Sequence, residues 1–156
     1  MKISTKGKYG LRAMIDLAQY SEQEAVSISS IAQRQKISES YLEQLVAKLK
    51  KAGLVVSIRG AAGGYRLARP ASGISVGDVL RALEGDVRAV ICTAQTEEGC
   101  EGEELCVTKY VWQRINESIE KTVDEMMIDQ LVAESRKAQE KAKAHSVDYS
   151  QNSCSG

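Results

Sequence analysis

A glycine-rich stretch between two short apolar segments constrains the fold of this chain more than any other feature. In LVVSIRGAAGGYRL, residues 54–67, apolar side chains alternate with smaller or polar ones on both sides of the glycines. Alternation with a period of two is typical of β-strands, and clustered glycines mark a turn between them. The stretch therefore predicts a hairpin of two short strands with a glycine-rich tip, and Pro70 ends the second strand region.

Three helices are predicted before this hairpin. Apolar residues at helical spacing predict the first over residues 5–20, with Thr5 as its cap. Ser27 can cap a short second helix, and Ser38 a third that ends before Gly53, the residue type that often follows a helix. The predicted elements thus follow the order of a winged helix-turn-helix: two helices, a short turn, a third helix and a hairpin. The chain is thus expected to be mainly α with a small β hairpin.

One short and one long helix are predicted after the hairpin. Ser75 and Asp78 have the spacing of a capping box, and Gly85 ends the helix that they start. From Val107 an apolar stripe predicts a long helix, whose natural use in so short a chain is a dimer interface. The expected organisation is a winged helix-turn-helix DNA-binding domain over 1–85, a cysteine-containing loop over 86–106, a dimerisation helix over 107–135 and a disordered tail over 136–156.

The third helix has one apolar face and one face of short polar groups. At about 100° per residue, Leu42, Leu45 and Leu49 gather on one side. The opposite side carries Ser40, Glu43, Gln44, Ala47 and Lys51. Gln can pair with adenine, Glu can accept from cytosine and Ser can serve either way, so this side suits the reading of base edges. An ordinary solvated helix face is the alternative.

The hairpin tip adds a second candidate for DNA contact. Arg59 lies there beside Gly60, where the backbone can approach phosphates closely and the guanidinium can enter a minor groove. Further candidates for phosphate contact are Lys2, Lys6, Lys8, Arg12, Lys48, Lys50 and Lys51. The tip sequence GAAGGY lacks the G-K-[ST] ending of a phosphate loop and the helix that follows one, which argues against nucleotide binding.

The net charge of zero hides an asymmetry between the two halves of the chain. Residues 1–70 hold 12 Lys or Arg and 5 Asp or Glu, whereas residues 71–156 hold 9 and 16. The half with the predicted helix-turn-helix therefore carries +7, which favours a polyanionic partner such as double-stranded DNA. A chance division of solvated surface charge is the alternative.

Composition argues against several other classes of protein. The one His, His145, lies in the polar tail, which argues against a Ser-His-Asp enzyme. No apolar run approaches the roughly 20 residues of a membrane helix. The N-terminus has no apolar region of the kind found in export signals. We therefore expect a cytoplasmic protein with no membrane partner and no enzymatic activity.

Three of the four cysteines, Cys92, Cys100 and Cys106, lie within 15 residues. Thiolates so clustered suit an iron–sulfur cluster, zinc or copper(I). The spacing contains no C-x2–4-C pair, so it favours an iron–sulfur cluster over a structural zinc site. Three free thiols in a loop are the alternative, and the lack of a C-x-x-C pair argues against a thiol redox enzyme. Cys154, near the chain end, is expected to be free.

Three segments together carry a resemblance to a known family. They are the start MKISTKGKYGLRAM, the stretch ISESYLEQLVAKLKKAGLVVSIRGAAGGYRLAR and the three cysteines before a long helix. Over roughly residues 1–130 the chain resembles the IscR-type bacterial regulators, winged-helix repressors that sense iron–sulfur status. The resemblance implies a homodimer on a two-fold related operator, and a [2Fe–2S] cluster on which promoter choice depends. It also implies DNA recognition through Ser38, Ser40, Tyr41, Glu43, Gln44 and Arg59.

One position departs from that family pattern. IscR-type proteins commonly have a His three residues after the last cysteine, and here that position holds Lys109. A solvated Lys has a pKa of about 10.4 and offers no lone pair near neutral pH, so Lys109 is not expected to ligate iron. The fourth ligand stays open between a group of the partner subunit, a solvent molecule and the carboxylates of Glu97, Glu98, Glu101, Glu103 or Glu104.

The sequence thus predicts a dimeric DNA-binding regulator whose operator preference depends on an iron–sulfur cluster. The resemblance extends this to genes of iron–sulfur cluster biogenesis as the targets. Two alternatives stay open. One is a related winged-helix repressor without a cluster that senses a small molecule or a protein partner, and the other is a thiol redox enzyme.

Overall fold

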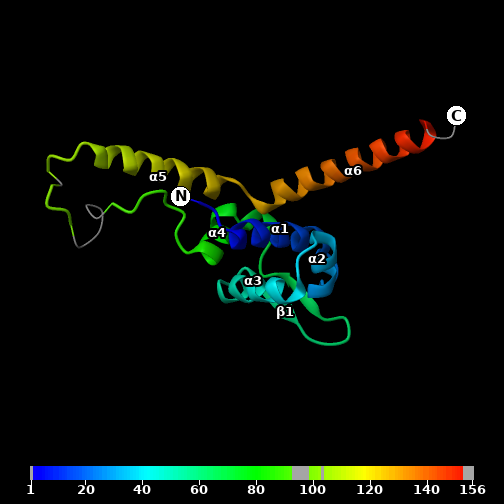
Figure 1. The fold of residues 1–156 in the computed structure, drawn as a ribbon. Helices are drawn as coiled ribbons and strands as arrows, with labels where there is room; N and C mark the ends of the chain where they lie inside the picture. Colours follow the sequence, from blue (N-terminus) through cyan, green and yellow to red (C-terminus); the bar gives the residue numbers. More distant parts are fainter. Residues whose placement is uncertain (1, 93–98, 103, 153–156) are drawn as a thin grey trace.

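A computed structural model describes residues 2–92, 99–102 and 104–152 as a head from which two helices project (Figure 1). The head holds α1 (Thr5–Tyr20), α2 (Ile28–Gln35), α3 (Glu39–Lys51), the antiparallel strands β1 (Val55–Ile58) and β2 (Gly64–Leu67), the 3-10 helix η1 (Ala71–Gly73) and α4 (Val76–Glu84). The projecting helices are α5 (Thr108–Glu125) and α6 (Ile128–Asn152), which extend in opposite directions. The predicted fold class is confirmed: the structure is mainly helical, with one small hairpin in the order of a winged helix-turn-helix.

Serine caps start three of these helices where the sequence predicts them. The Ser27 hydroxyl accepts from the backbone N–H of Ser30 at 3.1 Å, and the Ser38 hydroxyl from that of Tyr41 at 3.3 Å. At α4 the capping box is complete, because Ser75 and Asp78 each accept from the other's backbone N–H at 3.0 Å. These bonds satisfy N–H groups that have no partner within the first helical turn.

The prediction that Thr5 caps α1 is wrong. Ser4 is the N-cap residue and makes no capping bond of its own; the cap comes from Glu84 at the end of α4. One carboxylate oxygen, Oε1, accepts from Ser4 Oγ at 2.5 Å, from Ser4 N at 2.9 Å and from Gly7 N at 3.0 Å. A Cβ on Gly7 would lie 2.6 Å from that oxygen, so glycine makes the approach possible. A cap supplied 80 residues away leaves no local sequence signal.

The core of the head forms where the apolar faces of the helices meet. Its fully buried side chains include Met14, Leu17, Ile31, Leu42, Leu45, Leu49, Val55 and Ile74. In the hairpin, Val55 is buried opposite Leu67, whereas Val56 and Ile58 on the other face are exposed. Val26 pairs with Tyr65 through two backbone bonds of 2.8 and 2.9 Å, which attach the segment before α2 to the hairpin. The hairpin of β1 and β2, which is the wing of the winged helix-turn-helix, is therefore fixed to the helices at its base.

The predicted long helix over 107–135 is wrong as a single helix, because the chain breaks it at Met126 and Met127. Met126 has extended backbone angles, φ −85° and ψ 108°. Its carbonyl accepts from Val76 N at 2.8 Å, and Ile128 N donates to the Ile74 carbonyl at 2.9 Å. Ile128 is fully buried in the core of the head. Backbone pairing with residues 74–76 thus outweighs the helix propensity of this segment. The spacing of apolar residues in the sequence cannot reveal such a pairing.

The predicted disorder of the tail is also wrong over 136–152, since α6 continues to Asn152. Its segment KAQEKAKA consists of good helix formers, which extend a helix once its first turns are anchored. The anchor is the burial of Ile128 and Val132 in the head. Residues 153–156, with Cys154, lie outside the described residues. Within the described part of the chain, no helix is both long and apolar enough to cross a membrane.

The Glu84 cap makes stability depend on pH in the acid range. The hydroxyl of Ser4, with the backbone N–H groups of Ser4 and Gly7, lowers the pKa of Glu84 below its ordinary value. A carboxyl with a lowered pKa stabilises the fold above its unfolded-state pKa and loses that effect as pH falls through its folded-state pKa. We expect Glu84→Ala to reduce the free energy of unfolding by about 1 kcal/mol at pH 7. In urea titrations the difference from the parent protein should shrink below about pH 4, and an unchanged difference at pH 3 would contradict the cap.

Candidate nucleic-acid interface and cysteine loop

The exposed face of α3 is the polar face that the sequence predicts. Leu42, Leu45 and Leu49 are buried to 1% exposure or less, so the helix is fixed with its leucine side inward. The residues on the opposite side, Ser40, Glu43, Gln44, Ala47 and Lys51, are all exposed. A helix that is packed against the core on one side and exposes polar groups on the other side can enter a DNA groove.

Two of the predicted recognition residues also have structural contacts. Ser38 uses its hydroxyl to cap α3. Tyr41 is half-buried and packs edge-on against Tyr9 of α1, with ring centroids 6.2 Å apart and an interplanar angle of 87°. These two residues therefore set the position of the first turn of α3, whereas Ser40, Glu43 and Gln44 are its exposed polar groups.

The tip of the wing is exposed and shaped by its glycines. Arg59 and Gly60 are both exposed, and Gly60 has φ +113°, a conformation that favours glycine. Gly63 N donates to the Gly60 carbonyl at 3.0 Å, and a Cβ on Gly63 would lie 2.5 Å from the Ile58 carbonyl oxygen. The turn is therefore closed on itself and presents the Arg59 side chain at its outer end.

The basic residues around this face divide into two groups. Arg12 donates to the Gln35 side chain at 3.2 Å and to its carbonyl at 2.6 Å, and Lys50 donates to Ser57 at 3.0 Å. These two side chains connect elements of the head to one another. The exposed basic residues for which phosphate remains the predicted partner are Lys2, Lys6, Lys8, Lys48 and Lys51.

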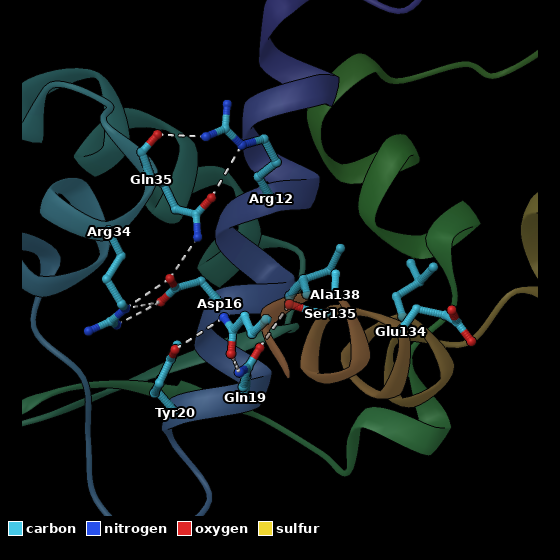
Figure 2. A pocket seen from close by; sticks show the side chains of 12 residues that line it. Arg12, Asp16, Gln19, Tyr20, Arg34, Gln35, Glu134, Ser135 and Ala138 are labelled. Atoms are coloured by element: carbon cyan, nitrogen blue, oxygen red, sulfur yellow. Dashed lines mark hydrogen bonds and ion pairs between the residues drawn. The ribbon is translucent and has the colours of Figure 1, made fainter. Parts of the chain in front are cut away.

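A buried ion pair that sequence reasoning missed holds α2 against α1 (Figure 2). The Asp16 side chain is fully buried and accepts from Arg34 Nη2 at 2.7 Å and Nε at 2.9 Å. Gln35 Nε2 donates to the same carboxylate at 2.8 Å. The guanidinium lies 4.2 Å above the Tyr20 ring, and its hydrogen bond to Asp16 raises the pKa of Arg34. The available signal was a lone acid between Ile15 and Leu17 in an apolar stretch.

Helix α6 packs against the side of the head that carries the Asp16–Arg34 pair. Ser135 Oγ donates to Gln19 Oε1 at 3.1 Å, and Gln19 Nε2 donates to Gln139 at 3.0 Å. Arg136 pairs with Glu22 at 2.8 Å. Figure 2 shows the contacts of Gln19 beside the Asp16 pair, in an open pocket of about 570 Å³ between α1, α2 and α6. The second projecting helix thus contacts the head on α1, next to the ion pair that positions α2.

The structure does not bring the predicted cluster ligands together. Cys92 and Cys106 are half-buried and Cys100 is exposed, and all three are free thiols. Across the described residues there is no group of three or more Cys, His, Asp or Glu side chains arranged to hold a metal ion. Cys106 Sγ lies 3.2 Å from Thr108 Oγ1, and this hydrogen bond, with the backbone N–H of Lys109, lowers the pKa of the Cys106 thiol. Glu97, Glu98 and Glu103 lie outside the described residues.

The part of the cysteine loop that precedes Cys92 is attached to α5 through Asn116. This side chain is 4% exposed, and its Oδ1 accepts from Ala89 N at 2.9 Å and from Val90 N at 3.3 Å. Its Nδ2 donates to the Val90 carbonyl at 2.8 Å. Sequence reasoning missed this residue, whose signal was a single amide in the apolar stripe of α5.

Three large apolar side chains of α5 are exposed in the single chain. Tyr110, Val111 and Ile115 are 63%, 49% and 39% exposed. Asn116 is the one buried residue of α5, a helix that the structure describes in full. Val111 and Ile115 are four residues apart and so lie on one face of the helix, and exposed apolar groups placed in this way on a projecting helix are typical of an interaction surface.

Comparison with known proteins identifies this architecture. Residues 3–134 match the Rrf2 family, described as iron-dependent transcriptional regulators. The chain belongs to the Rrf2 family. Among its relatives is the HTH-type transcriptional regulator IscR of Yersinia enterocolitica, 42% identical over 132 residues, which are 85% of this chain and 79% of the relative.

Solved structures of Rrf2 regulators have the same fold. IscR of T. potens has a TM-score of 0.71 and 45% identity, covering 89% of this chain and 91% of that one. CymR, titled the global cysteine regulator of B. subtilis, has a TM-score of 0.71 and 41% identity, covering 85% and 97%. These relatives are transcriptional regulators and not enzymes, so the present Rrf2 protein is a transcriptional regulator with a winged helix-turn-helix.

Removing the buried carboxylate should destabilise the head. In Asp16→Ala, Arg34 and Gln35 lose their shared acceptor, and we expect the free energy of unfolding to fall by about 2–3 kcal/mol in urea titrations. The matched control is Glu125→Ala, which removes an exposed pair with Lys121. That change should stay within about 0.5 kcal/mol. Equal losses in the two variants would show that the Asp16 pair does not hold α2.

Proposed function

We propose that this Rrf2 regulator binds double-stranded operator DNA as a homodimer in the cytoplasm, and that an iron–sulfur cluster on its cysteine loop modulates operator preference. Genes of iron–sulfur cluster biogenesis are the proposed targets, by analogy with relatives named IscR. The observation that carries the proposal is the polar face of α3, exposed beside the wing while the leucine face is fully buried.

In this proposal α3 lies in the major groove. The exposed amide of Gln44 can pair with adenine, the carboxylate of Glu43 can accept from cytosine, and the Ser40 hydroxyl can serve either way. Ser38 and Tyr41 contribute through the first turn of α3, which they position and from which their remaining polar atoms can reach phosphates.

The wing contacts the adjacent minor groove or its phosphates. Arg59 extends from a tip where Gly60 adds no side-chain bulk, so the guanidinium can approach the DNA closely. A narrow minor groove concentrates negative potential and attracts such a group. The exposed lysines of α1 and α3 add contacts that are independent of sequence.

The homodimer is supported by the uncovered face of α5. Tyr110, Val111 and Ile115 would leave water if the same face of a second copy packed against them, as two-fold symmetry requires. Two heads joined in this way present two α3 helices to a two-fold related operator.

Cys92, Cys100 and Cys106 are the proposed ligands. Thiolates are the donors that iron–sulfur clusters prefer, and the lowered pKa of Cys106 favours its thiolate form, so the donor set fits the group in chemistry. When bound, a cluster, proposed as [2Fe–2S], supplies a redox-sensitive link between three loop positions. The chain's own part is to bring the three thiolates together against α5, which changes the segment between the head and the dimer helix.

A second candidate function is a Rrf2 regulator that senses without a cluster. Two observations favour it: the cysteines within the described residues are not gathered, and CymR has the same fold at 41% identity. Such a protein would respond to a small molecule or a protein partner. Anaerobic purification separates the two candidates, since only the cluster protein is coloured and contains iron and sulfide.

The wing assignment predicts a specific loss of DNA affinity. Arg59→Ala should weaken operator binding about ten- to hundredfold and reduce the salt dependence of binding, measured by fluorescence anisotropy at several salt concentrations. The control is Arg69→Ala, which removes the same charge where the guanidinium bonds Gly73 and Asp78 instead of extending from the tip. Equal affinities for the two variants would contradict a role for the wing tip.

The acid on the exposed face of α3 predicts a change in specificity. A carboxylate there repels phosphates and acceptor base edges, so Glu43 excludes sequences as well as selecting cytosine. Glu43→Ala should select a wider set of sequences in a binding-site selection and should still bind the operator. Glu140→Ala removes an equal charge from α6, the helix that projects from the head and carries none of the proposed DNA contacts, and should leave the selected motif unchanged. An unaltered motif for Glu43→Ala would overturn the assignment.

The ligand assignment predicts a division among variants after anaerobic reconstitution. Cys92→Ala, Cys100→Ala and Cys106→Ala should each lose most iron and sulfide, because three thiolates are the minimum soft set. Lys109→Ala should keep its cluster, since the ammonium has no lone pair, and Cys154→Ala should keep the visible spectrum. An iron content for Lys109→Ala as low as that of Cys106→Ala would show that Lys109 is a ligand or an essential support.

A further inference from the structure

We propose that Asn116 is the positioning residue of the cysteine loop. By holding the backbone at Ala89 and Val90 against α5, it sets where Cys92 stands relative to that helix and so governs how firmly a cluster is retained. The effect on the cluster rests on the proposed function, whereas the attachment itself does not.

The contacts of Asn116 use both ends of its amide. Oδ1 accepts from two consecutive backbone N–H groups, at 2.9 Å from Ala89 and 3.3 Å from Val90, and Nδ2 donates to the Val90 carbonyl at 2.8 Å. The side chain is 4% exposed on a helix whose neighbouring positions are largely open to water. Only a side chain with an acceptor and a donor on one short stem can make all three bonds.

The position of this attachment relates it to the cysteines. Val90 lies two residues before Cys92, and Cys106 lies two residues before Thr108, the first residue of α5. Both ends of the loop are therefore attached to α5. The N-terminal end is held by the hydrogen bonds of Asn116, and the C-terminal end is held because the chain continues directly into the helix. Holding both ends reduces the entropy that the loop must lose when its thiolates come together.

Loss of the attachment should release the loop without unfolding the protein. A leucine at position 116 has the same number of side-chain heavy atoms as asparagine, branched at the same position, but leaves two N–H groups and one carbonyl without partners. Ala89 and Val90 are half-buried, so these groups can reach water by a local movement. Asn116→Asp keeps the acceptor for both N–H groups and loses the donor to Val90, which makes it the conservative variant.

The first measurement uses the cluster-free full chain and follows hydrogen exchange at the amides of Ala89 and Val90. Asn116→Leu should speed their exchange about tenfold or more, the equivalent of one lost hydrogen bond, and Asn116→Asp should stay close to the parent. The control is Asp124→Ala, which breaks the α4–α5 pair with Arg81, made at 2.7 and 2.9 Å on the same helix. It should leave both amides unchanged. Unchanged exchange in Asn116→Leu would overturn the attachment.

The second measurement uses anaerobically reconstituted protein and follows the release of iron to a chelator. Asn116→Leu should release iron several-fold to about tenfold faster than the parent, Asn116→Asp less so, and Asp124→Ala at the parental rate. Faster exchange with parental iron release would overturn the positioning role. If the parent binds no iron, the proposed cluster fails while the exchange experiment still decides the attachment. Should Asn116→Leu fail to fold, Asn116→Ala removes the same three hydrogen bonds without adding bulk and carries both predictions.

Discussion

Two backbone hydrogen bonds between distant segments determine how the parts of this regulator are arranged. Val76 donates to the Met126 carbonyl and Ile128 donates to the Ile74 carbonyl, so a short antiparallel pairing stands where the sequence suggests the middle of one helix. The pairing turns that helix into α5 and α6, which project in opposite directions (Figure 1). It also buries Ile128 in the core of the head. Because the pairing joins the start of α4 to the end of α5, the winged helix-turn-helix cannot shift relative to the helices without breaking it.

This arrangement supplies a continuous set of contacts between the cysteine loop and the DNA-binding face. The loop segment is attached to α5 through Asn116, and α5 meets α4 through the Arg81–Asp124 pair. Beyond the break, α6 contacts α1 at Gln19, one turn from the buried Asp16 pair that holds α2 (Figure 2). A change in the loop that repacks α5 can therefore reach the helix-turn-helix through contacts that already exist. In the proposed mechanism this change occurs when the three thiolates of the loop come together. The loop with its thiolates together and the loop with its thiolates apart are the two states between which a ligand selects.

Local signals explain what the sequence could predict. The serine caps at Ser27, Ser38 and Ser75 act within three residues, and the leucine face of α3 is a simple repeat, so the helices and the winged order followed directly. The predictions that failed depend on distant partners. Glu84 caps α1 from 80 residues away, and the break at Met126 arises from pairing with Ile74 and Val76. The functional residues that sequence reasoning missed, Asp16 and Asn116, are polar groups inside apolar stripes, where only the fold shows which partner satisfies them.

In the proposed mechanism, the state of the cysteine loop changes which DNA sequences the regulator prefers. The most direct measurement is a parallel binding-site selection with one preparation of the parent protein, half kept anaerobic with about two irons per chain and half stripped of iron by a chelator. We expect two different sets of selected operators, both two-fold related, with the iron-free protein still bound to DNA through α3 and the wing. The same motif with the same affinity from both halves would contradict it.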